Sequence, residues 1–404
     1  MAGHFFHKTE KSRALPRILI RDGLFVNSKT GAAFSPRGFN YIRLRPYQII
    51  PDVDWHDTFN PKRYGGQEAE SLFHDLKENG FNIVRVFIDH LPVEGILESQ
   101  GSGILSPVYI QNVCDFLSRS SAAGIYAILT FPWFPESRSY HGLDQENEED
   151  APYHNASYFN PRYINVKIRY LSEFIRALKE ISPDLMNVIF AYELENETLF
   201  CVDEPPFSLK EDKYNFHDDY YNLSDPMEKQ RLADDAVRGW ADLCSAAIRR
   251  ENPKALVGAS VFTFHAVGRS GPVSHFTEPV SDRRFPARPL ALAKTSIDFL
   301  DIHLYAEQDI QASLGKNLDS VEFPRVKDEC LRQGKPLIMG EFGAFKERFP
   351  TIEEAASAMK TQAELARDLG FRGWLFWTYD TEEQERLWNA KSEDGQIFHA
   401  LSPL

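Results

Sequence analysis

The sequence predicts an α/β fold in which eight parallel strands alternate with helices and close into a (β/α)8 barrel. Short apolar runs rich in β-branched residues alternate with amphipathic segments along most of the 404 residues. Several amphipathic segments stop at a glycine, as at Gly80, Gly124 and Gly370, where a helix would turn back toward a strand. Eight such repeats need about 250 residues, which leaves on the order of 150 for insertions.

The chain is expected to open with a β-hairpin near residues 17–35, because Asp22-Gly23 is a turn signal between two apolar runs. We expect this hairpin to cap one end of the barrel. Eight strands follow in the prediction, at residues 38–42, 82–88, 125–131, 187–193, 255–260, 297–303, 336–341 and 371–377. Helices are predicted at residues 67–79, 107–123, 161–181, 225–251, 320–333 and 352–369.

Residues 1–404 are expected to form a single catalytic barrel domain. The longest predicted insertions follow the third, fourth, fifth and eighth strands, at about residues 132–160, 198–224, 261–289 and 378–396. All four would project from the carboxyl-terminal rim, where barrel enzymes build their sites. Trp133 lies among many aromatic residues in the third-strand insertion, and rings beside polar groups either pack on the barrel shoulder or stack on sugar faces.

Composition excludes several kinds of partner. The net charge is −14 and Lys and Arg are dispersed, so neither nucleic acid nor an anionic membrane surface is an expected partner. The four cysteines are far apart, which predicts free thiols and no zinc, and no motif calls for another metal or a cofactor. No apolar run approaches a membrane span, and residues 1–13 do not look like a secretory signal. We therefore expect a cytoplasmic protein.

Two carboxylates stand out because each follows a buried strand. Glu197 comes after the apolar run 188–192, and Glu341 comes directly after the run 337–339. A surface glutamate normally lies on a polar helix face or in a loop. Glu197 and Glu341 are therefore candidates for a catalytic pair at the rim, against the alternative of buried ion-pair partners without chemistry.

From residue 38 to residue 380 the chain resembles glycoside hydrolase family 5, the cellulase and mannanase family of retaining barrel enzymes. The resemblance rests on landmarks in order at successive strand ends: Gly38-Phe-Asn-Tyr, Asn82-Ile-Val-Arg85-Val, Glu193-Leu-Glu-Asn196-Glu197, Asp301-Ile-His303-Leu-Tyr305, Gly340-Glu341-Phe-Gly and Gly373-Trp-Leu-Phe-Trp377. The resemblance implies that Glu197 is the acid/base and Glu341 the nucleophile of a double displacement.

Further roles come from the same resemblance. Asn196 would hold the sugar 2-hydroxyl, His303 and Tyr305 would line the reactive subsite, and Trp377 would be the floor on which the sugar stacks. Strand-end capping, a packed histidine and core packing are the structural alternatives for these residues.

Charge compensation and the two-residue period of a strand lead to two further expectations. A cation such as Arg85 inside a barrel mouth must be compensated, so we expect it to pair with a carboxylate, and Arg85 and Tyr305 could both donate to Glu341. The two-residue period of a strand places Glu193 on the same face as residues 195 and 197.

Some positions depart from the family pattern. The third strand ends without the histidine found in many members, and Thr198 stands where a proline often follows. His141 or His154 could fill the histidine's role from the insertion. The acidic run Asp52, Asp54, His56 and Asp57 fits no calcium loop and is interpreted as a solvated turn.

The bulky insertions after the third and fourth strands favour a pocket closed at one end. The sequence therefore predicts a retaining β-glycosidase that acts on β-linked oligosaccharides, most simply an exo-acting β-mannosidase. The leading alternative is an endo-acting β-mannanase or β-glucanase with an open groove. A catalytically silent carbohydrate-binding barrel is a third hypothesis, which retention of both glutamates disfavours.

Overall fold

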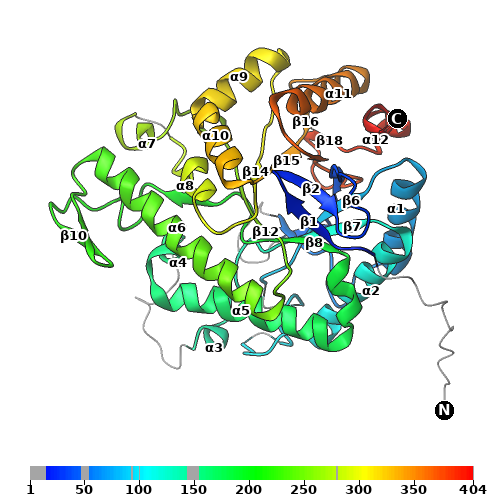
Figure 1. Ribbon diagram of the computed structural model, residues 1–404, viewed down its shortest axis with the longest axis horizontal. Helices are drawn as coiled ribbons and strands as arrows, with labels where there is room; N and C mark the ends of the chain where they lie inside the picture. The colour runs from blue at the N-terminus through cyan, green and yellow to red at the C-terminus, as the bar shows by residue number, and fades with distance from the viewer. Residues whose placement is uncertain are drawn as a thin grey trace.

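The computed structural model describes residues 15–46, 54–91, 94–99, 101–142, 154–278 and 281–403. Its centre is a closed barrel of eight parallel strands (Figure 1), which confirms the predicted fold class and all eight predicted strands. In chain order the barrel strands are β3 (Arg37–Asn40), β6 (Ile83–Phe87), β7 (Tyr126–Thr130), β8 (Ile189–Glu193), β12 (Val257–Val261), β14 (Phe299–Ile302), β15 (Leu337–Phe342) and β17 (Trp374–Phe376).

Helices surround the barrel, and all six predicted ones are present. They are α1 (Gly66–Glu78), α2 (Pro107–Ala123), α5 (Pro161–Ile181), α6 (Pro226–Glu251), α10 (Phe323–Gln333) and α11 (Ile352–Leu369). Local chemistry fixes their ends. Thr351 and Glu354 form a reciprocal capping box at the start of α11, and Gly370 ends it in the left-handed conformation.

Among the described residues, sequence patterns missed three α-helices of five or more residues, α8 (Pro289–Ala293), α9 (Ile310–Ser320) and α12 (Ser392–Leu401), and the four-residue helices α3 (Arg138–His141), α4 (Ala156–Phe159) and α7 (Ser274–Thr277). The last insertion was predicted to extend to residue 396. It is shorter than predicted, because helix α12 already begins at Ser392. Its first turn contains three residues with positive φ, Glu393, Asp394 and Gly395, so no helical period continues through it.

The hairpin of β1 (Ile18–Arg21) and β2 (Leu24–Asn27) closes the amino-terminal end of the barrel, as expected, and lies in front of the barrel strands in Figure 1. Its Phe25 ring is 4.9 Å from the ring of Phe190 and 5.8 Å from that of Phe299. Ile18 and Phe25 belong to one apolar cluster with interior residues of the barrel strands. This end of the barrel is therefore a packed core.

Small antiparallel sheets build the opposite rim. They pair β4 (Leu44–Pro46) with β5 (Asp54–His56), β9 (Leu199–Cys201) with β13 (Arg284–Pro286), β10 (Tyr214–Phe216) with β11 (Asp219–Tyr221), and β16 (Ala344–Phe345) with β18 (Leu387–Trp388). Two predicted insertions thus contact each other, because the one after β8 supplies β9 and the one after β12 supplies β13.

The first-strand loop corrects the interpretation of residues 52–57 as a solvated turn. Asp54 lies in strand β5, and Asp57 is 3% exposed and pairs with Arg45 and Arg63. Asp52 lies outside the described residues. Residues 1–14 also lie outside them, and the cytoplasmic location expected from the composition of that segment stays a prediction. The acidic run was wrongly interpreted as solvent-exposed, because the sequence did not reveal the arginines that pair with it.

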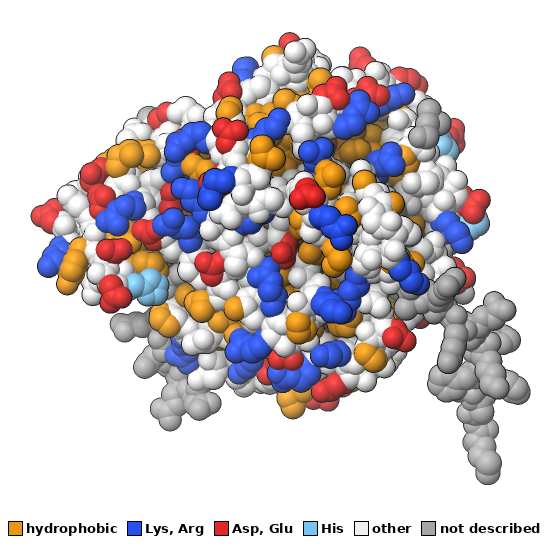
Figure 2. All heavy atoms as spheres, viewed as in Figure 1, with side chains coloured by type: hydrophobic (Ala, Val, Ile, Leu, Met, Phe, Trp, Pro, Cys, Tyr) orange, Lys and Arg blue, Asp and Glu red, His pale blue; other side chains and the backbone are white. Residues whose placement is uncertain are grey.

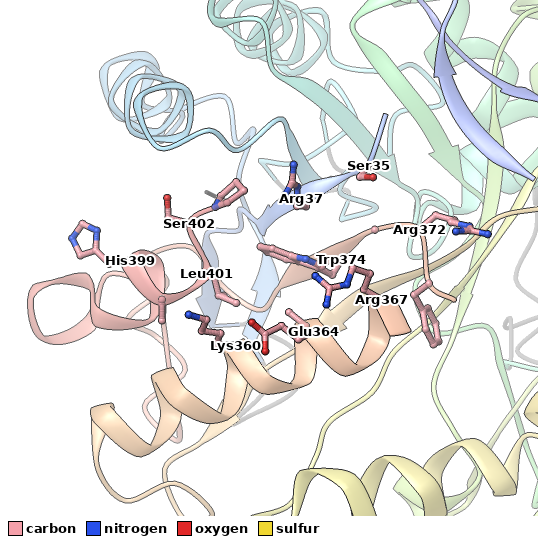
Figure 3. A pocket seen from close by; sticks show the side chains of 15 residues that line it. Ser35, Arg37, Lys360, Glu364, Arg367, Arg372, Trp374, His399, Leu401 and Ser402 are labelled. Atoms are coloured by element: carbon pink, nitrogen blue, oxygen red, sulfur yellow. The ribbon is translucent and has the colours of Figure 1, made fainter. Parts of the chain in front are cut away.

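A hollow of about 560 Å³ lies at the amino-terminal end of the barrel, between β17, α11 and α12 (Figure 3). It is lined by Trp374 and by basic side chains including Lys360 and Arg367. On the face that carries the hairpin, Lys and Arg are interspersed with Asp and Glu (Figure 2). The four cysteines are free and buried, which confirms the expected thiols. Among the described helices, none is both long and apolar enough to cross a bilayer.

Replacing Phe25 by Ala is expected to lower the free energy of unfolding by about 3–5 kcal/mol, because a fully buried aromatic ring is lost from the barrel end. Denaturant unfolding measures this change. Leu331→Ala is the control, since that side chain is 75% exposed and its loss should change stability by less than about 0.5 kcal/mol. Equal effects in the two variants would contradict a packed hairpin plug.

Candidate active site

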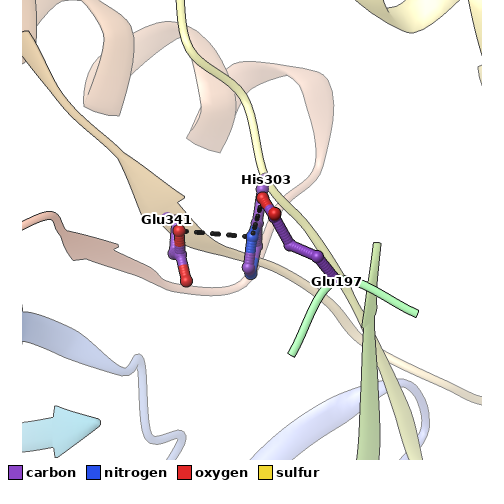
Figure 4. Close-up of side chains that lie close together, drawn as sticks. All are labelled: Glu197, His303 and Glu341. Carbon is purple, nitrogen blue, oxygen red and sulfur yellow. Dashed lines mark hydrogen bonds and ion pairs between the residues drawn. The ribbon is translucent and has the colours of Figure 1, made fainter. Parts of the chain in front are cut away.

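Glu197 and Glu341 converge at the carboxyl-terminal opening of the barrel, on either side of His303 (Figure 4). One oxygen of each glutamate and one ring nitrogen of His303 all lie within 4.8 Å of one another. Glu341 is on β15, and its side chain is 5% exposed. Glu197 lies four residues beyond the end of β8, and its side chain is 25% exposed. The two candidate carboxylates therefore differ in environment, one buried and the other at the opening.

Arg85, on β6, connects the strands beneath these glutamates. Its guanidinium is fully buried and donates to Glu193 at 2.6 Å, Glu341 at 2.7 Å, Asn196 at 2.8 Å and Asn40 at 2.9 Å. The expected pairing of Arg85 with a carboxylate is confirmed, and there are two carboxylates rather than one. Asn40 was not predicted as a site residue, although its position at a strand end could have pointed to it.

Glu341 receives hydrogen bonds from two directions. Arg85 donates to its Oε1 at 2.7 Å, and the Tyr305 hydroxyl donates to its Oε2 at 3.0 Å. Both contacts were expected from the sequence. Burial raises the pKa of Glu341, while the nearby charges of His303 and Arg85 act to lower it.

His303 lies between the two glutamates. Its Nδ1 is 3.0 Å from Glu197 Oε1 and 3.4 Å from Glu341 Oε2, and its Nε2 is 3.6 Å from Asp301 Oδ2. Burial alone would lower the pKa of this imidazole, but the charges of Glu341 and Asp301 outweigh it and raise the pKa to about 10. This raised pKa favours the imidazolium form of His303 at neutral pH. That charge makes it more than the packed histidine considered from the sequence.

The backbone at Glu197 is held in an uncommon conformation. Its φ is 52°, in the left-handed region that glycine usually occupies. Ser260 on β12 fixes this turn, because its Oγ accepts from the Glu197 N–H at 2.9 Å and donates to the Glu195 carbonyl at 3.0 Å. The Thr198 N–H also donates to the Ser260 carbonyl at 2.8 Å. Ser260 was missed because its partners are some 60 positions away in the chain.

The expected common face of residues 193, 195 and 197 is wrong. Glu193 points into the barrel toward Arg85, whereas Glu195 is buried beside Tyr158, whose hydroxyl is 3.4 Å from its Oε2. Lys167 lies close enough to Glu195 to lower its pKa against the effect of burial. The two-residue period holds only within an extended strand, and β8 ends at Glu193.

Trp377 lies at the opening, 8% exposed, with its Nε1 donating to Gln384 at 2.6 Å. It meets the Phe87 ring edge-on at 5.7 Å, and the His56 ring stacks on Phe87 at 3.9 Å. His56, assigned to a turn from the sequence, therefore packs against rings of the opening. Whether a sugar stacks on Trp377 stays a prediction.

The third-strand insertion holds its own aromatic cluster. Trp133 stacks on Phe134 at 4.6 Å and on His154 at 5.2 Å. His154 bonds the Leu199 carbonyl and His141 bonds the Pro135 carbonyl, so both rings are engaged with backbone. The substitute-histidine role considered for His141 and His154 finds no support in these contacts. Sugar binding by Trp133 stays a prediction, and residues 143–153 of this insertion lie outside the described residues.

Comparison with known proteins points to one family. The family model for cellulase (glycosyl hydrolase family 5) matches residues 46–383. A search of curated protein sequences finds no match.

Among solved structures, the chain resembles an endo-1,4-β-mannanase from Rhizomucor miehei, with 17% identity, a TM-score of 0.63 and coverage of 96% of this chain and 98% of that one. It also resembles an exo-β-1,4-mannosidase from an Opitutaceae bacterium, strain TAV5, with 16% identity, a TM-score of 0.56 and coverage of 93% and 57%. At such identities these structures support the fold alone.

Replacing Arg85 by Met is expected to lower the free energy of unfolding by about 3–5 kcal/mol, because two buried carboxylates lose their counter-ion. Arg386→Met is the control. It breaks an ion pair with Glu347 whose side chains are 77% and 59% exposed, so its expected cost is below about 1 kcal/mol. Denaturant unfolding measures the loss in the free energy of unfolding for both variants. Equal losses would contradict the role of Arg85.

Proposed function

The chain belongs to the cellulase family, glycosyl hydrolase family 5, which makes it a glycoside hydrolase, and we propose that it is a retaining β-glycosidase acting on β-mannosides. One observation supports the retaining mechanism above all others. Oxygens of Glu197 and Glu341 lie within 4.8 Å of each other. Retaining enzymes place their two carboxyl groups about 5–5.5 Å apart, whereas inverting enzymes need about 6.5–9.5 Å to admit a water.

Glu341 is the proposed nucleophile. Arg85 and Tyr305 donate to its two oxygens, which stabilises the carboxylate and fixes its orientation. One oxygen attacks the anomeric carbon as the glycosidic oxygen leaves, and a covalent glycosyl ester forms on Glu341. The charges of His303 and Arg85 offset the burial that would otherwise keep this carboxyl protonated.

Glu197 is the proposed acid/base. Its greater exposure places it where the leaving group and the incoming water must pass. In the first step it gives its proton to the glycosidic oxygen, and in the second it takes a proton from the water that attacks the ester. The hydrogen bond to Ser260 fixes the backbone of this residue while its carboxyl performs both tasks.

Asn196 and Trp377 are the proposed sugar-binding groups. The Asn196 amide oxygen accepts from Arg85, which leaves the amide nitrogen available as a donor to the 2-hydroxyl. Such a contact can tighten as the sugar ring flattens in the transition state. Trp377, fixed by Gln384, supplies an apolar face beside the opening. Trp133 is a further candidate for sugar contact at the rim.

Exo action on short β-linked oligosaccharides is the preferred mode. Support comes from the rim, where the insertion after β8 is tied to the one after β12 through the β9–β13 pair, and such a structure would block one end of a groove. A similar solved structure is named an exo-β-1,4-mannosidase. The alternative is endo action on β-mannan or β-glucan, and another similar structure is named an endo-1,4-β-mannanase. A silent sugar-binding barrel is the least favoured reading, since both carboxylates are in place.

Glu341→Ala is expected to lower kcat by at least on the order of 10⁴-fold, and Glu197→Ala by about 10²–10⁴-fold on substrates with poor leaving groups. Adding azide to each variant, with an activated aryl β-mannoside, should restore turnover and give glycosyl azides of opposite anomeric configuration. NMR of the products identifies each anomer. Glu353→Ala, on the exposed side of α11, is the control and should match wild type. Unchanged activity in either glutamate variant would exclude the assigned role.

Early products distinguish the two modes of action. We expect mannose as the sole small product when the enzyme acts on a β-1,4-mannohexaose, followed stepwise by shorter chains, because a closed subsite admits one terminal sugar. Chromatography at low conversion measures this. Several internal fragments appearing together, or rapid loss of viscosity in a mannan solution, would favour the endo alternative and reject exo action.

A further inference from the structure

Two acidic side chains meet beneath the proposed catalytic pair. Glu193 ends β8 and Asp301 lies on β14, and both strands flank β12 in the barrel. Strand β12 presents Gly258, in register with Glu193, and the small Ser260, in register with Asp301. The Phe299 ring fills the space over Gly258, where a Cβ atom would lie 2.2 Å from it, so the carboxyl groups of Glu193 and Asp301 can approach only across the small Ser260. Both side chains are fully buried.

Each carboxyl group has one oxygen that accepts hydrogen bonds and one buried oxygen that accepts none. Glu193 Oε2 accepts from Arg85 at 2.6 Å and from Thr130 at 2.8 Å, and Asp301 Oδ1 accepts from the Gly340 N–H at 2.5 Å. Among the described residues, Glu193 Oε1 and Asp301 Oδ2 accept no hydrogen bond, and His303 Nε2, 3.6 Å from Asp301 Oδ2, is also without a hydrogen-bond partner. The two side chains are nevertheless within hydrogen-bonding reach of each other. Two ionised carboxylates cannot hydrogen-bond, so a hydrogen bond between these side chains requires a proton on one of them.

The backbone around Asp301 is shaped for this contact. A Cβ atom at Gly340 would lie 1.7 Å from Asp301 Oδ2, so any side chain at position 340 would displace that oxygen. Position 340 is next to Glu341, which ties the placement of Asp301 to the proposed nucleophile. The space for the Glu193–Asp301 contact therefore depends on a glycine in β15.

Charge balance supports a single shared proton. The buried cations are Arg85 and His303, and the buried acids around them are Glu193, Asp301 and Glu341. With one proton on the Glu193–Asp301 pair, two anions remain opposite two cations. Without it, a third buried anion would have no counter-ion, which is costly at this depth.

We propose that Glu193 and Asp301 share one proton beneath the active site, and that this proton keeps Arg85 and His303 directed toward Glu341. The proton resides on Glu193 Oε1 and is donated to Asp301 Oδ2, which faces the His303 imidazolium at 3.6 Å. Glu193 and Asp301 are thus positioning residues. Their link to catalysis rests on the proposed function, whereas the presence of the proton does not.

Titration follows from the surroundings of the pair. Burial and the charge of Asp301 raise the pKa of Glu193 to about 7 against the pull of Arg85, while the pKa of Asp301 is lowered by His303 and Arg85 against the effect of burial. The charged groups that face the pair are Arg85 from β6, His303 beyond β14 and Glu341 on β15. Because folding raises the pKa of Glu193 from 4.5, the folded protein binds the extra proton between these values, and this contribution to stability is lost as pH rises toward 7.

Infrared difference spectroscopy of the intact protein tests for the proton without any substrate. We expect the wild type minus Glu193→Gln spectrum at pH 6 to contain the carbonyl band of a protonated carboxylic acid, and this band should fade as pH rises through about 7. Asp301→Asn should lose the same band. The control is Glu195→Gln, because burial also raises the pKa of Glu195 to about 7, yet its loss must leave the band of the pair intact. Difference spectra without this band would overturn the proposal.

Activity tests the positioning role separately. In Glu193→Gln the amide nitrogen can donate to Asp301 in place of the proton, while the amide oxygen accepts from Arg85 and Thr130. We expect kcat at pH 6 to fall by no more than a few-fold and its decline at alkaline pH to flatten, whereas Glu193→Ala should lose on the order of 10²-fold at every pH because Arg85 is misplaced. A Glu193→Gln profile identical to wild type would overturn the positioning role. If no glycoside is hydrolysed by wild type, the infrared result still decides whether the proton is present.

If a variant does not fold, isotope labelling keeps the test open. Wild-type protein and Glu195→Gln protein grown with ¹³C-carboxyl glutamate should both show an acid band that shifts with the label and titrates near pH 7. A band that disappears in labelled Glu195→Gln protein would assign the proton to Glu195 and reject the shared pair.

Discussion

The buried guanidinium of Arg85 is the constraint on which the rest of the active site depends. A fully buried cation is tolerated only when ionised partners and hydrogen-bond acceptors surround it, and here they come from four other segments of the chain. Strand β3 supplies Asn40, β8 supplies Glu193, the loop after β8 supplies Asn196 and β15 supplies Glu341. The ends of these strands are therefore held in one arrangement by a single side chain.

Just beyond β8, the proposed acid/base Glu197 adopts an unfavourable backbone conformation that places its side chain over the barrel opening. Glu197 has a positive φ, which costs a non-glycine residue energy, and Ser260 offsets that cost with two hydrogen bonds to the same turn. The turn moves Glu195 out of the barrel and brings Glu197 over it. A regular continuation of β8 would instead have placed residues 195 and 197 on the face of Glu193, where a third acid would have no cation to balance it.

Sequence alone was sufficient for the barrel but not for the connections within its site. Runs such as 188–192 are apolar enough to be strands whatever surrounds them, and capping signals fixed helix ends to within three residues. Glu197, Glu341 and Arg85 could be found because each charged residue follows or interrupts an apolar strand. Asp57, His56 and Glu195 were misassigned because their burial depends on Arg45, Phe87 and Tyr158, partners that no local pattern reveals.

The two ends of the barrel divide stability from chemistry. At the amino-terminal end the hairpin supplies Ile18 and Phe25, and apolar packing there gains free energy without needing exact charge placement. At the other end the same strands present Arg85, Glu193, Asp301 and Glu341, whose burial costs free energy unless every charge is matched. A proton shared by Glu193 and Asp301 is the smallest correction that balances this end, since it removes one negative charge without adding a side chain. The apolar packing of the hairpin can therefore stabilise the fold, while the choice and placement of the charged residues at the other end follow from the requirements of the reaction.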